Sequence, residues 1–566
     1  MMKHILIITL IIFYSNKIIA QESGYNPTVV VIGNFQPTIN DASKINFSPT
    51  IKDSIIIKPE LSYMIIPKKI ETSFQIEPIK PMKLVDEKLT KLYKFLLKGG
   101  IGTYKTPYAE FFYSNQRSKK WSNNIHLKHI SSSGKIKNVG YSGWSDNIAE
   151  ANTCHYFNNL SLSGGISFSR NVVHYYGFNP DSVLKYFEIQ PTKKETKQRF
   201  FYTNTYVNLF NISIDSSKLD YKFKLNYNYV GDYYKRQEHN INFKGYIAQN
   251  LQLLPITKTQ IIGIKAETDI VSQIFTNKSS HTNTLISLKP FLNTKFGFFD
   301  INLGGDATII GDSTSYLHFY PKAEVHFRII RNILDFYGGF TGNAERYDYI
   351  RLSKENAFIS SSIPEVFTYN KAQIYGGINA SIAKNLDFYA KLSNNKIDNM
   401  PFFVRENNLI DTTERWLNKF TLNYDDINLL KLSGEFAYQQ RERIKITLGG
   451  SWNEYSLTLE KQPWYKPPYE FFLSAKYNIQ NKIIANAEVF YFGPVYGLTT
   501  GTYANSPMIT KKIKSYIDIN LLLEYRYNKV LSGFLNLYNI SGTRFEKWLD
   551  YPSRKFSLMA GITYAL

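Results

Sequence analysis

The sequence predicts an all-β protein: one large antiparallel transmembrane β-barrel of about 22 strands, preceded by a short extended N-terminal arm. Three observations lead to this prediction. Apolar and polar residues alternate over long stretches between Tyr93 and Leu566. Aromatic residues make up 16% of the chain although its mean hydropathy is only −0.28. The chain also ends inside an amphipathic segment. Aromatic rings on one face of many half-polar strands explain the first two observations. A last strand that pairs within the barrel explains the third.

The first twenty residues have the pattern of a secretory signal peptide. A basic start is followed by an apolar run from Ile5 to Phe13 and by the small residue Ala20. This run is too short to cross a membrane as a helix. We therefore expect residues 1–20 to direct the chain across the inner membrane and to be removed before Gln21. No cysteine follows the cut, which argues against a lipoprotein anchor.

Residues 21–92 are predicted to form an extended periplasmic or lumenal arm. Seven of the 21 prolines of the chain fall in this region. Prolines at such spacing prevent long helices and uninterrupted sheet, because each one removes a backbone donor. Alternation of apolar and polar residues begins at about Tyr93, so residues 93–566 are predicted to form the barrel.

Strict alternation identifies the barrel strands and the direction of their side chains. In residues 219–229, for example, leucines and rings occupy one face while lysines and asparagines occupy the other. The pattern places Phe223 and Leu521 on the lipid side, with Asn226 and Asn520 on the lumen side. Runs of about 10 to 15 residues exceed the usual length of soluble strands. An array of soluble β-sandwiches is the alternative, but it would show domain linkers and faces buried on both sides.

The last segment of the chain is predicted to close the barrel. Residues 556–566 alternate strictly and end without a tail. Bilayer hydrocarbon offers backbone groups no water, so a membrane-spanning sheet must pair its last strand with its first. The first strand is expected near residues 95–104. The closing face is formed by Phe556, Leu558, Ile562, Tyr564 and Leu566.

Charge and cysteine content exclude little by themselves. The formal net charge of +21 is compatible with nucleic-acid binding. In a secreted barrel, however, basic residues can instead face the lumen or the anionic membrane surface. We therefore predict no nucleic-acid partner, and we expect contact with outer-membrane lipid or lipopolysaccharide. Cys154 is the only cysteine, so the chain cannot form an internal disulfide.

The C-terminal third resembles the barrel of TonB-dependent receptors in the form common in Bacteroidota. The stretches that resemble it are residues 432–456, 462–497 and 534–566, in that order. The most specific part is "NLYN", followed by a tryptophan, then "YP", then a closing strand. The resemblance implies an outer-membrane location and both termini in the periplasm. It also implies that Trp548 and Tyr551, or Trp464 and Tyr465, belong to an aromatic girdle at the outer interface.

The chain departs from that family ahead of the barrel. Such receptors carry a folded plug of well over a hundred residues, whereas only 72 residues separate Gln21 from the barrel here. The chain is therefore expected to lack a full plug. The segment Thr28, Val29, Val30 and Val31 is similar to the short stretch through which the family engages TonB. An edge strand or an extended arm is the alternative interpretation.

Residue types that could support catalysis or metal binding show no functional spacing. His126 and His129 lie three apart, so on a strand they point to opposite faces. His318 and His326 share a face but lie roughly 26 Å apart at the usual strand rise. The glycines of "KGGIGTY" lack the helix that a phosphate loop needs. We therefore predict no enzyme activity, no metal and no cofactor, although some outer-membrane barrels are hydrolases with scattered site residues.

Two functions remain open from the sequence. The first is transport across the outer membrane by a barrel of the TonB-dependent type, with TonB as a partner. The second is a non-transporting accessory or structural barrel within an outer-membrane assembly or secretion complex, with other outer-membrane or periplasmic proteins as partners. A barrel of this size needs something in its lumen. The candidates are the arm, an inward fold of residues 342–367, or a partner, packed against lumenal rings such as Tyr516, Phe534 and Tyr538.

Overall fold

The structure is a computed structural model that describes most of residues 92–566. The undescribed positions within that span are 116, 189–190, 213–218, 252–254, 256, 258, 313, 332, 364–365, 407–417 and 501–507. The expected signal peptide (1–20), the arm up to residue 91 and the TonB-like segment Thr28–Val31 lie outside the described residues. The arm and the segment therefore stay predictions.

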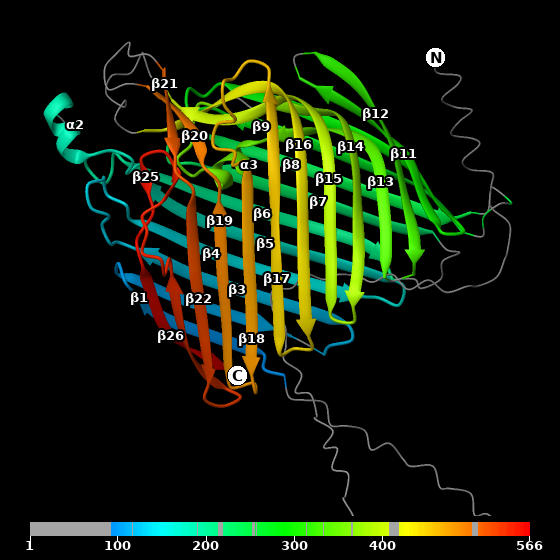
Figure 1. The fold of residues 1–566 in the computed structure, drawn as a ribbon, viewed down its shortest axis with the longest axis horizontal. Helices are drawn as coiled ribbons and strands as arrows, with labels where there is room; N and C mark the ends of the chain where they lie inside the picture. Colours follow the sequence, from blue (N-terminus) through cyan, green and yellow to red (C-terminus); the bar gives the residue numbers. More distant parts are fainter. Residues whose placement is uncertain are drawn as a thin grey trace, which may run out of the picture. The chain divides into compact units, whose positions relative to one another are not determined.

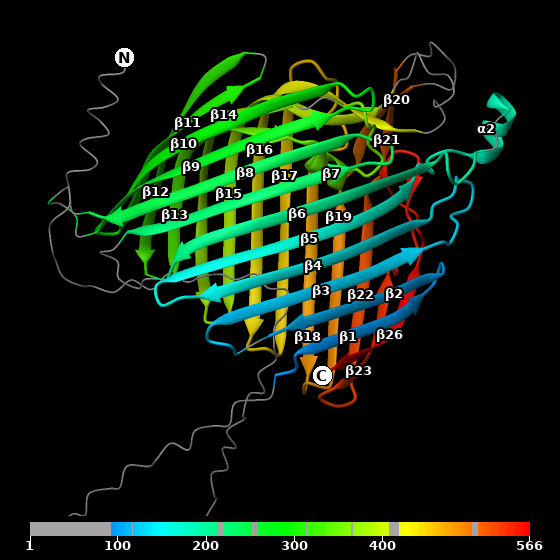
Figure 2. The same ribbon diagram turned by 180° about the vertical axis from the view of Figure 1, so that it is seen from behind.

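Twenty-two strands form one closed antiparallel sheet, which confirms the predicted barrel and its strand number. Each strand pairs with its neighbours in sequence order, and β26 pairs with β1 to close the ring. Figures 1 and 2 show the blue first strand beside the red last strand from both sides. Two small hairpins, β20–β21 and β24–β25, lie outside this sheet.

The bounds of the elements follow the chain. The first barrel strands are β1 (Phe95–Gly102), β2 (Thr106–Ser114), β3 (Trp121–Ser132), β4 (Trp144–Tyr156), β5 (Leu160–His174), β6 (Lys197–Asn211), β7 (Asp220–Gly231) and β8 (Gln237–Asn250). Next come β9 (Gln260–Ile274), β10 (Ser280–Phe296), β11 (Phe299–Gly311), β12 (Ser315–Ile330), β13 (Leu334–Tyr347), β14 (Val366–Ala383), β15 (Leu386–Arg405) and β16 (Phe420–Gln440). The last are β17 (Ile444–Leu457), β18 (Tyr469–Ile479), β19 (Ile483–Phe492), β22 (Tyr516–Arg526), β23 (Leu531–Tyr538) and β26 (Ser557–Ala565).

The remaining elements belong to the connections. They are α2 (Pro180–Phe187), α3 (Tyr349–Glu355), β20 (Val495–Thr500), β21 (Met508–Ile513), β24 (Glu546–Trp548) and β25 (Tyr551–Pro552). Among the described residues, no helix has the length and the apolar character needed to cross a membrane.

Side chains alternate between an apolar outside and a polar lumen along the wall. On β7, Phe223 stacks on Phe243 of the next strand at 6.3 Å, and Phe243 is exposed on the outer face. Asn226 instead donates to Asn242 at 3.4 Å inside the barrel. On β22, Ile517 and Tyr525 are exposed outside, whereas Asn520 is buried. The predicted lipid and lumen faces of these two strands therefore agree with the structure.

The strand that ends the chain closes the ring through a full backbone ladder. The register runs from Leu96 opposite Ala565 to Gly102 opposite Met559. The carbonyl oxygen of Leu566 accepts from the backbone N–H groups of Lys94 (2.7 Å) and Phe95 (2.9 Å). These bonds tie the last residue to the start of the first strand.

A pair of glycines lets the closing ladder fit beneath a lumenal ring. Gly100 lies directly opposite Gly561, and the Phe534 ring lies over both. A Cβ on Gly561 would come within 2.4 Å of that ring and within 2.2 Å of the Gly99 carbonyl. The glycines of "KGGIGTY" therefore belong to a barrel strand, where the neighbouring aromatic ring takes the space of the missing side chains.

The two ends of the barrel differ in their connections. The end that holds Lys94 and Leu566, here called the inner end after the expected orientation, carries short turns such as 480–482 and 527–530. The outer end carries the long connections, including those with α2, α3 and the two small hairpins. Figure 1 shows α2, β20, β21 and β25 at the end opposite the marked C-terminus. Any site built from irregular chain therefore lies at the outer end.

Candidate functional site

Connections of the outer end pack together into one buried cluster, here called the cap. Its core combines residues of α3 and the segment after it with the outer ends of β15 and β16 and with the loops before β18 and β26. Fully or nearly fully buried members are Tyr349, Leu352, Ile359, Ile363, Phe402, Phe403, Val404, Phe420, Trp464, Tyr465, Trp548, Leu549 and Tyr551. Phe200 of β6 and Val230 of β7 join the cluster from the wall. Of the three candidates for filling the lumen, the stretch 342–367 reaches this cluster through α3 and the segment that follows it.

A buried arginine fastens the α3 segment to the wall. Arg236, in the turn between β7 and β8, is only 1% exposed. Its guanidinium donates to the carbonyl oxygens of Ser361 (3.0 Å) and Ile363, and to the Gln273 side chain (3.2 Å). The same group lies 4.1 Å from the centre of the Tyr349 ring. Removing this charged donor would leave its three acceptors buried without a partner, so the arginine contributes strongly to holding the segment.

Two buried carboxylates hold the start of α3 from below. Glu238 of β8 is fully buried and accepts from the backbone N–H groups of Tyr349 (2.8 Å) and Ile350 (3.3 Å). Asp232 accepts from the Tyr349 hydroxyl at 2.9 Å and also from Ser361. These bonds satisfy donors that a helix start leaves open. The α3 segment is therefore bonded to the wall by Asp232, Arg236 and Glu238, which together are called the latch.

Asp348 gives the latch a titratable neighbour. Its carboxylate caps α3 by accepting from the Arg351 N–H at 2.8 Å. Burial, followed by the nearby negative charge of Glu238, raises the pKa of Asp348 to about 7. Deprotonation near neutral pH therefore places a second negative charge beside Glu238 and disfavours the docked segment.

Four aromatic residues predicted for an outer girdle lie inside the cap instead. Trp464 is 1% exposed and Tyr551 is 3% exposed. The Trp464 indole N–H donates to Glu460 at 2.6 Å, and the Tyr551 hydroxyl donates to the Asn418 carbonyl at 2.9 Å. The prediction of a girdle for Trp464, Tyr465, Trp548 and Tyr551 is wrong. These residues lie in a loop and in the very short strands β24 and β25, where no long alternation fixes the direction of a side chain.

Stacked rings make the cap a continuous aromatic unit. The Trp548 ring lies 5.4 Å from Phe420 and 5.0 Å from Tyr465. Phe358 stacks on Tyr551 at 3.8 Å. Aromatic pairs of this kind each add about 0.5–1.5 kcal/mol beyond the burial of their area.

Charged side chains line the lumen in pairs across neighbouring strands. Lys244 contacts Glu267 at 2.5 Å, and Lys289 bridges Glu267 (3.4 Å) and Asp306 (3.3 Å). The residues belong to β8 through β11. The lumen in this region therefore offers both signs of charge to a polar solute.

The rings predicted for the lumen pack against parts of this same chain. Tyr516 stacks on Phe545 of the connection before β26 at 4.2 Å. Phe534 covers the glycines of the closing ladder and meets Tyr108 edge-on at 6.0 Å. The Tyr538 hydroxyl accepts from Asn536 at 3.2 Å. Each of these rings therefore has its packing partners within this chain.

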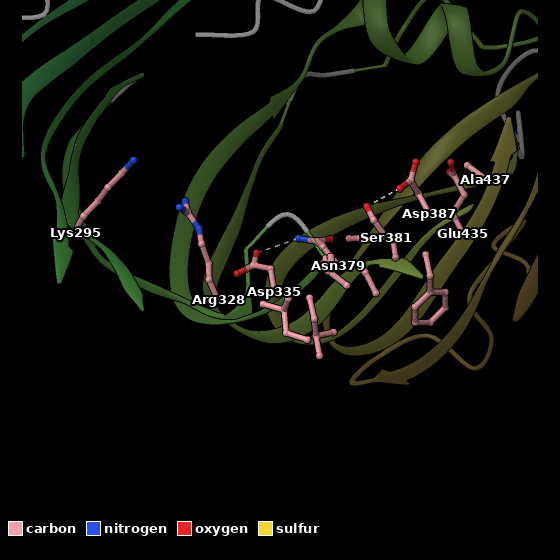
Figure 3. Close-up of a pocket in the computed structure, with 14 residues that line it drawn as sticks. Lys295, Arg328, Asp335, Asn379, Ser381, Asp387, Glu435 and Ala437 are labelled. Atoms are coloured by element: carbon pink, nitrogen blue, oxygen red, sulfur yellow. Dashed lines mark hydrogen bonds between the residues drawn. The ribbon is translucent and has the colours of Figure 1, made fainter. Parts of the chain in front are cut away.

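A mixed-charge pocket lies low on the lumen wall near the inner turns (Figure 3). It has a volume of about 740 Å³ and is lined from β10 and from β12 to β16. Asn379 donates to Asp335 at 3.4 Å, and Ser381 donates to Asp387 at 2.7 Å. Arg328 and Lys295 approach from one side, with Glu435 on the other. The pocket is open and polar, which suits transient contact with a polar solute or chain.

The N-terminal pair of histidines singled out in the sequence is separated by the structure. His126 lies in the lumen, with Nε2 3.0 Å from Glu110 and Nδ1 3.4 Å from Glu150. His129 instead bonds to Asn147 at 2.6 Å. The two rings have different partners, as opposite strand faces require.

The second pair lies on one strand but in two settings. His326 lies between Asp335 (2.9 Å) and Glu324 (3.2 Å), whereas His318 lies against the Tyr369 ring at 4.9 Å. Within the described part of the chain, no group of three or more His, Cys, Asp or Glu side chains is placed to hold a metal ion.

Sequence reasoning missed the latch. Asp232, Arg236 and Glu238 fall in and beside a short turn that reads as ordinary polar chain. Glu238 continues the lumen-facing row of β8 and so had a predictable direction. Its partner α3 comes from a connection more than a hundred residues later, which alternation cannot locate.

Comparison with known proteins shows the fold. The sequence matches no protein-family model and no curated protein sequence. Among solved structures, the siderophore receptor PirA from Acinetobacter baumannii is similar, with a TM-score of 0.63, 11% identity, and coverage of 85% of this chain and 81% of that chain. The pyoverdine outer-membrane receptor FpvA from Pseudomonas aeruginosa has a TM-score of 0.63, 11% identity and coverage of 85% and 79%. For the ferric-catecholate import receptor Fiu from E. coli, the TM-score is 0.61 and the identity is 9%, with coverage of 84% of this chain and 82% of that chain.

Proposed function

We propose that this chain is an outer-membrane transport barrel of the TonB-dependent type, in the form common in Bacteroidota. The observation that supports the proposal most is the closed 22-stranded wall with a charged lumen and with a cap built from its own outer connections. Such a wall has an apolar outside suited to lipid, and a bore wide enough for solutes beyond the size that small porins pass.

The proposed path runs from the outer end to the inner end. A solute meets the cap, enters the lumen when the latch releases the α3 segment, and passes the charged rows of β8–β11. The compared structures are receptors for siderophores and related iron ligands. Ferric siderophores are therefore the first class of solute to test. Catalysis has no place in this proposal.

Energy for opening is proposed to come through the N-terminal arm. In this scheme residues 21–92 reach from the inner end of the barrel, and Thr28, Val29, Val30 and Val31 contact TonB. The test is uptake of radio-iron carried by siderophores in cells with this chain as their only receptor of the type. We expect Val30→Pro, which prevents an added strand at that point, to abolish uptake at normal protein levels. Full uptake by this variant, or uptake without TonB, would contradict the coupling.

A second function is favoured by one feature of the sequence. The 72 residues between the predicted cut and the barrel contain seven prolines, a pattern that favours an extended arm over a folded plug. A structural or accessory barrel would use partners in place of a plug. Native purification from outer membranes separates the two: a stable stoichiometric complex that survives washing supports the accessory role, and a lone barrel supports transport.

A further inference from the structure

The wall has one seam where two neighbouring strands continue without pairing. Between β12 and β13 the ladder runs from Ile330 opposite Leu334 to Ala323 opposite Phe340. Residues 315–322 of β12 and 341–347 of β13 extend further toward the outer end, and β12 there keeps its pairing with β11 alone. Among the described residues of these strands, no backbone pair crosses the seam above Ala323.

A proline explains where the ladder stops. The N–H of Arg328 points to β11, so alternation turns the peptide groups of Leu317, Phe319 and Pro321 toward β13. Proline has no N–H to give at the next step of the ladder. On the facing strand, the register shifts across Gly342. Pro321 on β12 and the irregular register at Gly342 on β13 therefore both account for the missing pairs.

The neighbouring β10–β11 ladder is irregular at the same height. The β10–β11 ladder is interrupted between the pair Leu288 with Ala307 and the pair Phe291 with Gly304, next to Pro290. Gly305 lies directly opposite Pro321. The outer parts of β11 and β12, here called the flap, thus lie above a line of prolines and glycines, and the tip of β11–β12 projects at the outer rim in Figures 1 and 2.

Side chains close the seam, and they leave polar atoms without partners. The Tyr320 ring lies against Gly342, close enough that a Cβ there would be 2.7 Å from it. The His318 ring lies 4.9 Å from Tyr369 of β14. Within the described residues, the buried hydroxyl of Tyr320, Nε2 of His318 and Oδ1 of Asn370 accept or donate no hydrogen bond. Buried polar atoms of this kind normally have partners.

Apolar surface lies on both sides of the seam. Outside, Leu317 is 71% exposed and Phe319 is 66% exposed. Inside, Leu285, Ile310 and Phe367 form a buried apolar cluster, and Tyr369 packs against it. Apolar side chains therefore flank the seam on both faces of the wall.

We propose that the β12–β13 seam binds an acyl lipid of the surrounding leaflet, with its chain between the flap and β13 and its ester or hydroxyl group bonded to Tyr320 and His318. The inference goes beyond transport and rests only on the membrane placement proposed above. Hydrocarbon alone would leave the polar atoms unsatisfied, so the occupant carries hydrogen-bonding groups beside its chain. A strand from another protein fits less well, because an edge proline opposes added pairing.

The test is photo-crosslinking in the full chain, purified into nanodiscs of dioleoylphosphatidylglycerol. The photoreactive p-benzoylphenylalanine replaces Tyr369 at the inner side of the seam. Phe472, a lumenal ring of β18, is the matched control, and Phe319 is the lipid-facing control. We expect lipid adducts, identified by mass, at positions 369 and 319 and not at 472.

The outcomes separate this inference from the membrane placement. Adducts at 319 without any at 369, or equal adducts at 369 and 472, would overturn the seam as a lipid site. Loss of adducts at 319 as well would overturn the membrane placement itself. Pro321→Val restores a backbone donor and should remove most labelling at 369, whereas Pro107→Val on β2 should leave it unchanged. Unchanged labelling in the Pro321→Val chain would also contradict the proposal.

Discussion

The wall and the cap of this barrel close space by different physical means. The wall closes through backbone ladders, from Leu96 opposite Ala565 around the ring and back, with the outer part of the β12–β13 seam as the exception. The cap closes through side chains, with Arg236 and Glu238 holding α3 and with stacked rings around Trp548. Backbone pairing inside lipid has no substitute, because no water is there to replace it. Side-chain contacts at the outer end have water as an alternative partner, so the cap can open while the wall stands.

The largest effect is expected from shortening the closing strand. Deletion of residues 562–566 removes the partners of Leu96 through Gly99 and exposes an edge to lipid. We expect assembly to fail, seen as loss of heat-modifiable migration on a gel and of surface protein. A tail of five polar residues added after Leu566 is the matched control and should reduce assembly less. Normal surface levels of the deleted chain would mean that the wall does not depend on this ladder.

The next effect tests which side of the wall faces lipid. Leu521→Arg and Phe223→Arg place a cation on the outer face, which costs about 2–4 kcal/mol near the middle of the membrane. Asn520→Arg and Asn226→Arg place the same cation in the lumen and should be mild. Urea titration in lipid vesicles measures the free energy of unfolding of each of the four chains and so the cost of each arginine. Equal losses in both pairs would contradict the assigned faces.

The wall could be predicted from sequence and the cap could not, for one physical reason. Alternation with a period of two fixes the direction of each strand residue, so Phe223, Asn226 and Asn520 were placed correctly. Trp464 lies in a loop and Tyr551 in a two-residue strand, which is too short to show a period, and their contacts come from segments distant in sequence. The predicted girdle failed there for that reason.

A third prediction concerns the latch. Arg236→Met keeps the length and apolar stem of the side chain but removes donors to Ser361, Ile363 and Gln273. Charged hydrogen bonds of this kind are worth about 1.5–3 kcal/mol, so the α3 segment should open locally. Hydrogen exchange of residues 349–363 should speed up while exchange of β22 stays unchanged. Arg351→Met, on the exposed side of α3, is the control and should have little effect. Global loss of protection in the Arg236→Met chain would show that the cap and the wall are not separate.

The smallest effect concerns pH. The pKa of Asp348 is raised to about 7, so the carboxyl loses its proton as pH rises through that value. The docked segment should therefore be most stable below about pH 4 and should weaken as pH rises to about 7, with little further change above that, because the opened segment returns the pKa of this carboxyl to its usual value of 3.8 and only the docked form keeps the proton in this range. Hydrogen exchange of residues 349–363, corrected for intrinsic rates, should show this trend. Asp348→Asn keeps a capping oxygen and should flatten it. A steeper trend in Asp348→Asn would assign the pH response to another group.

Conductance in a planar bilayer tests most directly whether the cap narrows the outer mouth. The chain without residues 21–91 is compared with the same chain carrying Arg236→Met, at equal protein and salt. The cap predicts small steps in the first chain and larger or more frequent openings in the second. Large, steady pores of one size in both chains would contradict it, because the lumen would then be open whatever the state of the latch.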